Sequence, residues 1–256
     1  MSYLVEIWLA ASLVALAAGA VGYVVVLRRA AFAAHALPMA AFPGAAASSL
    51  FGFSLPAGLA GFALGGAALL TLVQRSARRD SATGLLLAGF LALGALCLSL
   101  SGHYAGSVYG LLFGQVFALG PEDLPVLGLS GLCLPILLWL GLRPLVLSAM
   151  APDLMRVQGG QPRLAELAFL ALLALAAGFA VPVTGALLVF SLMLGPGATA
   201  SRFCKRLETG LLFAMVIALG LVWVALGLTY MTNWPVGFFT GTGSALIYLL
   251  ARLKTV

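Results

Sequence analysis

Apolar residues form long blocks along the whole chain, and short polar segments separate these blocks. A helix of about 20 apolar residues spans the hydrocarbon core of a bilayer, because each residue adds 1.5 Å. The pattern predicts an all-α polytopic membrane protein that is one transmembrane domain over residues 1–256, with about nine spans. The predicted spans cover residues 3–27, 32–52, 55–74, 82–100, 124–142, 164–180, 182–200, 210–230 and 236–251.

Prolines interrupt two of these blocks. The second block contains Pro38 and Pro43, and the seventh lies between Pro182 and the segment Gly195-Pro196-Gly197. Proline has no backbone N–H, so the carbonyl four residues earlier loses its helical partner. Lipid tolerates such a carbonyl only where it faces protein or a water-filled cavity. We therefore predict that helices 2 and 7 are broken and that the second lines a path. If one of them is re-entrant, eight spans result.

The composition supports a membrane protein and excludes several functions. Hydrophobic residues make up 63% of the chain, charged residues make up 8%, and the mean hydropathy is +1.15. These values exclude a large soluble domain. The basic pI of about 9.7 reflects basic residues at helix ends, so we expect no nucleic-acid partner. The chain lacks the phosphate-binding motif G-x-x-x-x-G-K-[ST], so we expect ATP hydrolysis on another chain. The apolar residues 107–119 are too short to cross, and we expect them at the outer side.

The positive charges fix the predicted orientation. With nine spans and an external N-terminus, all 13 Lys and Arg fall in the inner segments. Cytoplasmic loops of membrane proteins carry this excess of positive charge. The first span contains Glu6 and has no basic residues before it, which is typical of an anchor rather than a cleaved signal peptide. We predict an external N-terminus and a cytoplasmic C-terminus.

One apolar block carries an ionisable side chain near its start. His35 lies in the second block, and Met39 follows four residues later. Residues four apart share one face of a helix. An ionisable residue inside a membrane is a functional-site hypothesis by default. The alternative is a hydrogen-bonded structural histidine beside a methionine that fills a gap between helices.

The longest polar segment, residues 143–163, contains a short predicted helix. Pro152 and Asp153 begin it, Arg156 lies in its last turn, and Gly159-Gly160 ends it. This is typical of a rigid knob between two spans, and the alternative is a plain connector.

The order of several motifs resembles the permeases of the zinc/manganese/iron ABC importer family. The motifs run along the chain from about residue 5 to 250 and are Leu27-Arg28-Arg29 with Phe42-Pro43-Gly44, Leu112-Phe113-Gly114-Gln115 with Pro121-Glu122-Asp123-Leu124, Ala151-Pro152-Asp153-Leu154 with Gly159, and Gly185-Ala186-Leu187-Leu188-Val189 with Pro196-Gly197-Ala198-Thr199-Ala200-Ser201-Arg202.

The resemblance implies a bacterial plasma (inner) membrane protein that works in an assembly. Two permease copies would form the pathway, and a cytoplasmic ABC ATPase dimer would drive it. A periplasmic or lipoprotein metal-binding protein would deliver a divalent ion, zinc, manganese or iron, with no permanently bound cofactor. Asp153, Arg156 and Gly159 would belong to the segment that docks on the ATPase.

The sequence departs from the family pattern at the metal-contacting pair. The family's second helix carries Asp and, four residues later, His. The same register here holds His35 and Met39. Imidazole and thioether favour softer or borderline ions, so Cu(I) joins zinc as a candidate.

Two other classes remain open from the sequence. A permease for a chelated metal or a vitamin-like cofactor, of the siderophore or cobalamin type, would need no ligating pair. An intramembrane enzyme would need paired acids, a Ser/His pair or an H-E-x-x-H helix, and the spans contain none of these.

Overall fold

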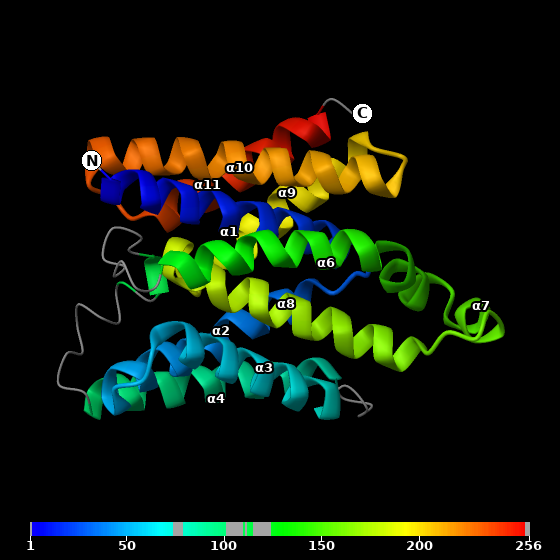
Figure 1. The fold of residues 1–256 in the computed structure, drawn as a ribbon, viewed down its shortest axis with the longest axis horizontal. Coiled ribbons are helices and arrows are strands. Elements are labelled where there is room, and N and C mark those ends of the chain that lie inside the picture. Colours follow the sequence, from blue (N-terminus) through cyan, green and yellow to red (C-terminus); the bar gives the residue numbers. More distant parts are fainter. Residues whose placement is uncertain (1, 74–78, 101–109, 111, 115–123, 254–256) are drawn as a thin grey trace.

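The computed structural model describes residues 2–73, 79–100, 110, 112–114 and 124–253 (Figure 1). Within these residues the regular structure is helical, which confirms the predicted class of polytopic helical membrane protein. The helices are α1 (Ser2–Leu27), α2 (Ala31–Phe51), α3 (Leu55–Val73), α4 (Arg79–Leu100), α6 (Leu124–Met150), α7 (Pro152–Val157), α8 (Pro162–Thr184), α9 (Val189–Phe203), α10 (Leu207–Thr232) and α11 (Val236–Leu253).

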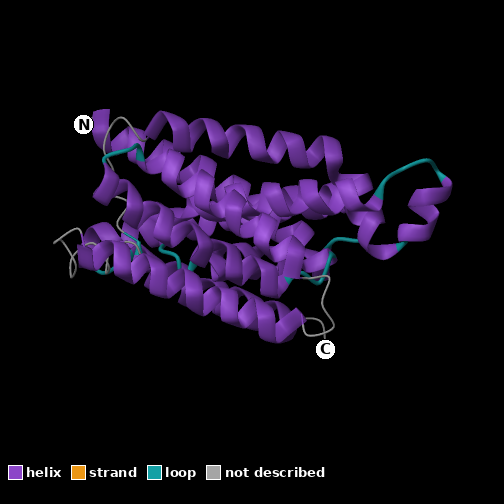
Figure 2. Cartoon of the chain, turned by 90° about the horizontal axis from the view of Figure 1, so that it is seen from below, coloured by secondary structure: helices purple, strands orange, loops and turns teal. Residues whose placement is uncertain are grey.

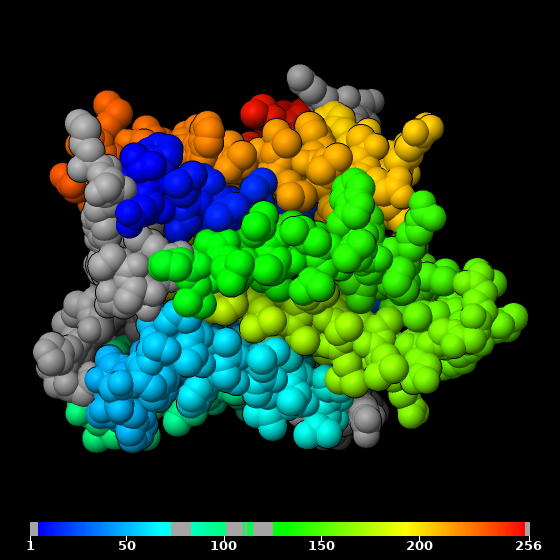
Figure 3. Space-filling model, in the orientation of Figure 1, coloured from blue at the N-terminus to red at the C-terminus, as the bar shows by residue number. Residues whose placement is uncertain are grey.

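The long helices pack as two groups that share α8. In one group α1 packs against α6, α9 and α10, and in the other α2 packs against α3 and α4. Helix α8 contacts members of both groups, including α1, α6, α2 and α3. Figure 2 shows the long helices running roughly side by side. Helix α7 projects from one end of this bundle, as the space-filling view also shows (Figure 3).

The helix ends and the chain termini lie at two opposite ends of the bundle. The N-terminus and the turn between α10 and α11 lie at one end of the bundle, and α7 and the last residues of α11 lie at the other (Figure 1). This agrees with an odd number of crossings. The segment predicted to lie at the outer side falls mostly outside the described residues: of residues 107–119 the structure describes 110 and 112–114, and Glu122 and Asp123 are not described.

Glycine lets two helices of the first group touch through their backbones. A Cβ added to Gly22 of α1 would lie 2.0 Å from the Met193 carbonyl oxygen of α9. A Cβ added to Gly197 would lie 2.5 Å from the Gly22 carbonyl oxygen. Membrane helices associate through small residues because lipid provides no hydrophobic driving force between them. These contacts hold α1 and α9 together.

Seven of the described helices are long and apolar enough to cross a bilayer, namely α1, α3, α4, α6, α8, α10 and α11. Helices α2 and α9 fall outside this set. Helix α9 has 15 residues, which corresponds to roughly 22 Å and is shorter than the hydrocarbon core of about 30 Å. The shortness predicted for the seventh block is therefore present.

Helix α2 is not broken, which corrects the sequence prediction. It is α-helical from Ala31 to Phe51, and Pro38 and Pro43 lie inside it. Its surroundings explain this, because nearly every residue from Ala33 to Ser48 is buried among neighbouring helices. Carbonyls that lose a partner to proline are tolerated inside protein without a break in the helix.

The seventh predicted span also begins later than expected. Pro182 belongs to the last turn of α8, and α9 runs through Pro196 to Phe203 without a break. The interruption lies at 185–188 instead, where Gly185 has a φ of +84°. Its backbone approaches the 112–114 segment so closely that an added Cβ would lie 2.3 Å from the Leu112 carbonyl oxygen. The turn is thus set by contact with a distant segment.

Candidate functional site

A tight turn positions the start of α2. Helix α1 ends at Leu27, and α2 begins at Ala31. Arg29 has a φ of +54° in this turn. The Ala30 N–H donates to the Val25 carbonyl over 3.0 Å, which closes the end of α1. His35 therefore lies just beyond the first turn of a helix whose starting point is fixed.

The side chain of His35, on α2, packs against α9. Its ring meets the ring of Phe190 edge to face, with the centroids 5.3 Å apart and an angle of 77°. The side chain is half-buried, and its Nδ1 atom is buried without a hydrogen-bond partner among the described residues. Buried polar atoms are nearly always paired, so an orphaned one requires an explanation such as a bound ion or water. Imidazole nitrogen is the commonest protein ligand for a transition metal.

Met39 lies one helical turn after His35. Its side chain is 0% exposed and belongs to the apolar core. The carbonyl of Met39 faces Pro43, and that of Ala34 faces Pro38, so both lack a helical N–H partner. Helix α2 thus carries an imidazole and a thioether close to two backbone carbonyls that have no helical N–H partner.

The donor set of one chain is small. Among the described residues, no three His, Cys, Asp or Glu side chains gather as a metal cluster. His35 and Met39 supply two side-chain donors, which is fewer than the four typical of a closed zinc site. This arrangement suits transient contact more than permanent binding. The structure brings the two predicted residues onto one helix but does not test their role.

The short helix predicted between Pro152 and Gly159 is present as α7. Arg156 Nη1 donates to Asp153 Oδ1 over 2.6 Å. Gly159 adopts a φ of +78°, and the Gly160 N–H donates to the Met155 carbonyl over 2.9 Å. The positive φ at Gly159 ends the helix, as predicted from the sequence.

One face of α7 is anchored and the other is free. Met155 is buried, whereas Val157 is 85% exposed and Leu154 is 50% exposed. Apolar side chains exposed at the end of a bundle, beyond the membrane-spanning helices, mark interaction sites more often than lone surface residues do. The charged residues of α7 stand out in the sequence, whereas these two apolar residues carry no signal there.

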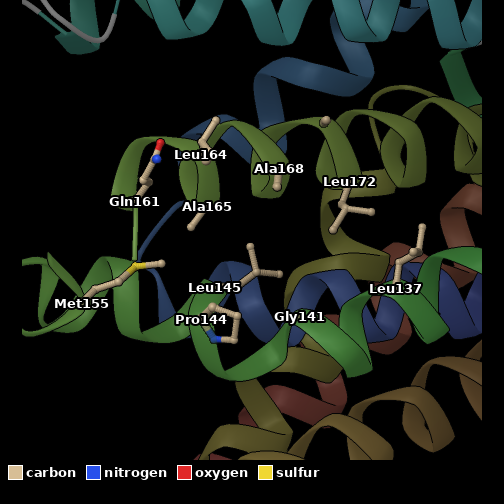
Figure 4. Close-up of a pocket in the computed structure, with 11 residues that line it drawn as sticks. Leu137, Gly141, Pro144, Leu145, Met155, Gln161, Leu164, Ala165, Ala168 and Leu172 are labelled. Carbon is tan, nitrogen blue, oxygen red and sulfur yellow. The ribbon is translucent and has the colours of Figure 1, made fainter. Parts of the chain in front are cut away.

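Met155 reaches into an apolar groove between α6 and α8. Figure 4 shows its side chain extending toward Leu145. The groove has a volume of about 650 Å³, and Gln161 is the one polar side chain among the described residues that line it. Its lining is Leu137, Gly141, Pro144, Leu145, Met155, Gln161, Leu164, Ala165, Ala168, Ala171 and Leu172. The groove holds no charged group, so it anchors α7 and offers no ion site.

These features define a class of protein. A polytopic helical bundle with a half-buried imidazole on a proline-containing central helix, and with a rigid helical projection at one end, has the organisation of a membrane-embedded transport subunit. The sequence model of the ABC 3 transport family matches residues 1–255, and the chain belongs to this family.

Several known proteins are similar over most of their length. The manganese import system permease protein ScaB of Streptococcus gordonii is 26% identical over 243 residues, which are 94% of this chain and 87% of ScaB. The manganese transport system membrane protein MntC of Halalkalibacterium halodurans is 30% identical over 83% of this chain and 74% of MntC. A chain of PsaBC from Streptococcus pneumoniae, solved in complex with Fab, has the same fold, with a TM-score of 0.89 at 23% identity over 98% of this chain and 91% of that chain.

Proposed function

We propose that this protein is the permease subunit of an ABC transporter that imports a divalent transition metal ion. The proposal rests on membership of a transport family and on two relatives, one named as a manganese import system permease protein and the other as a manganese transport system membrane protein. The observation that carries it is the buried, unpartnered Nδ1 of His35 on α2. The cargo is zinc, manganese or iron, and copper is a further candidate because of Met39.

His35 and Met39 contact the ion during its passage. A second copy of the chain supplies a second pair, so that two imidazoles and two thioethers surround one axis. This donor set has no fixed negative charge and is softer than an Asp/His set. The site is weak, as a transit point must be, because tight binding would prevent release. Met39 is enclosed in the present conformation, so the ion reaches it when α2 moves against its neighbours.

Metal uptake by cells that carry substitutions in this pair tests the proposal. His35→Ala and Met39→Ala each remove one donor, and we expect each to lose most uptake. The double change His35→Asp with Met39→His restores a hard oxygen and an imidazole, so we expect preference to shift toward manganese or iron. Uptake of zinc, manganese, iron and copper is measured with protein in the membrane quantified.

Two control variants separate ion contact from packing. Met193→Ala removes another methionine that is 0% exposed, but on α9. Phe190→Leu removes the ring that contacts His35 and keeps the imidazole. We expect both controls to retain more uptake than the variants of the pair. Normal uptake in His35→Ala and Met39→Ala, with normal amounts of protein, would contradict the role of the pair.

The proposed assembly includes three partners. A second permease copy completes the pathway, a cytoplasmic ABC ATPase dimer supplies energy, and an external metal-binding protein delivers the ion. Helix α7 is the ATPase contact. Its exposed Leu154 and Val157 would enter a groove on the ATPase, while Asp153 and Arg156 orient it and Gly159 fixes its end. The assembly lies in the bacterial plasma membrane with the N-terminus outside and the C-terminus in the cytoplasm.

A further inference from the structure

Arg28 makes three contacts inside the bundle from the turn between α1 and α2. Its Nη1 donates to Ser148 Oγ over 2.7 Å and also to the Leu145 carbonyl. Its guanidinium lies over the ring of Phe169, 4.4 Å from the centroid. Charge-assisted hydrogen bonds and cation–π contacts are stronger than their neutral counterparts, so these contacts hold the side chain in place.

The three partners come from the two helices that α7 joins. Ser148 and Leu145 lie in the last turns of α6, close before Pro152, the first residue of α7. Phe169 lies in the first half of α8, which follows α7. Ser148 Oγ in turn donates to the Leu145 carbonyl over 2.8 Å, so the two acceptors of Arg28 are held together. One side chain therefore contacts both arms of the hairpin that carries α7.

The backbone around Arg28 is equally fixed. The Arg28 N–H donates to the Val24 carbonyl over 2.9 Å, and the Arg29 N–H donates to the Val26 carbonyl over 3.1 Å. The Ala34 N–H then donates to the Ala30 carbonyl over 3.1 Å, which continues directly into α2. His35 follows Arg28 by about two helical turns. A displacement of Arg28 thus moves the start of the helix that carries the proposed metal pair.

Arg28 stays charged although its surroundings lower the pKa of its guanidinium. Burial lowers the pKa of its guanidinium, and the negative charge of Glu166 raises it. Arginine stays protonated in proteins despite such shifts. A half-buried positive charge is unfavourable unless it is paired or hydrogen-bonded. Breaking the contacts of Arg28 with α6 and α8 would therefore leave its charge without partners, so the turn that carries Arg28 stays attached to these two helices.

We propose that Arg28 is a positioning residue that couples movement of the α6–α7–α8 hairpin to α2. This inference rests on the proposed function, in which α7 contacts the ATPase and α2 contacts the ion. When the ATPase displaces α7, the ends of α6 and α8 move with it. Arg28 then transfers this movement to the turn and so to His35. Coupling between sites requires such a physically connected chain of contacts.

The test measures metal uptake and ATP hydrolysis together, in liposomes that contain the permease and its ATPase. Arg28→Gln removes the charge and the paired contacts. We expect it to lower the number of ions transported per ATP about tenfold, while hydrolysis stays within about twofold of wild type. Arg28→Lys keeps the charge without the planar fork, so we expect it to restore coupling only in part.

Arg29→Gln is the matched control. Arg29 is the neighbouring residue, carries the same charge and is exposed. Its substitution removes one positive charge from the same segment without touching α6 or α8. We expect its transport per ATP to stay within about twofold of wild type, because exposed charges contribute little to internal contacts. A loss equal to that of Arg28→Gln would mean that the charge of the segment matters and would overturn the inference.

Ser148→Ala and Phe169→Leu each remove one of the three partners of Arg28 and leave Arg28 itself in place. If the Arg28→Gln protein does not insert into the membrane, these two variants test the inference instead. We expect each to lower transport per ATP, and an unchanged ratio in both would overturn the inference. Unchanged transport per ATP in an inserted Arg28→Gln variant would do the same. Failure of the proposed function looks different, because the wild-type complex would then show no hydrolysis stimulated by any of the four metals.

Discussion

Gly22 shows how strongly a single residue constrains this bundle. The nearest atom to a Cβ added at Gly22 is a backbone oxygen of α9 at 2.0 Å, which cannot rotate away as a side chain could. We expect Gly22→Ala to separate α1 from α9 and to destabilise the protein by about 1–3 kcal/mol, the usual range for overpacking. The loss of stability is measured by heating the purified protein in detergent and recording how much of it remains monodisperse at each temperature.

Gly65→Ala is the control for this substitution. A Cβ at Gly65 of α3 meets no atom within 4 Å. Alanine is the better helix former, so we expect Gly65→Ala to leave stability unchanged or slightly raised. Equal stability of the two variants would show that α1 and α9 do not need backbone contact.

At the level of residues, the sequence predicted the candidate pair but not its surroundings. His35 stands out because it is ionisable within an apolar block, and the spacing to Met39 puts both on one face. Phe190 carries no such signal, because a phenylalanine in an apolar helix is ordinary. The contact between His35 and Phe190 arises from the packing of α2 near α9, which spacing along one helix cannot indicate.

Helix α7 is the element on which the proposed ATPase contact depends. We expect Val157→Asp and Arg156→Glu each to weaken binding of the ATPase about thirtyfold, because the few hot-spot residues of an interface contribute about 2 kcal/mol or more each. The first change puts a charge on the exposed apolar face. The second replaces the ion pair with Asp153, at 2.6 Å, by two like charges. Co-purification and metal-stimulated hydrolysis measure the effect.

Gln158→Glu is the matched control, because Gln158 is exposed immediately after α7. It adds a negative charge beside the helix without changing its apolar face or its ion pair. We expect it to retain the ATPase. Full stimulation in both Val157→Asp and Arg156→Glu would show that α7 is only a connector.

At the level of elements, the sequence predicted which segments are helical better than where they end. Each of the nine apolar blocks corresponds to a helix, and the one for the seventh block, α9, is short. The fifth block continues past Arg143 and Pro144 to Met150, and the Arg143 side chain pairs with Glu208 of α10 at 2.9 Å. Pro38, Pro43 and Pro182 do not end their helices. Their neighbours in space decide this, and those neighbours are distant in sequence.

At the scale of the whole molecule, the charges and the arrangement of helix ends make one topology prediction. We expect Gln158→Cys, beside α7, to react with a membrane-impermeant maleimide only after the plasma membrane is permeabilised. We expect Thr232→Cys, at the end of α10, to react from outside the cell. Burying one arginine at a span centre costs about 2.5–3.5 kcal/mol on the insertion scale, so the reverse assignment of several charged loops is strongly disfavoured.

The labelling uses a background in which the native thiols Cys97, Cys133 and Cys204 are replaced. Strong labelling of residue 158 from outside would contradict the orientation. Because arginines occur at 28–29 and again at 75, 78 and 79, both α2 and α3 must cross if these charges share one side. The prediction therefore also tests nine crossings against eight.

The contact of α1 with α9 has a consequence for biosynthesis. Helix α1 leaves the ribosome well before its partner α9, which begins only at Val189. At the usual 5–20 residues per second, roughly ten to thirty seconds pass before that partner is made. During this interval the glycine face of α1 has lipid or the insertion machinery as its neighbour. The order of synthesis therefore leaves α1 in the bilayer without α9 for this time. A nascent chain that stalls before α9 exposes a face of α1 that cellular quality control can recognise.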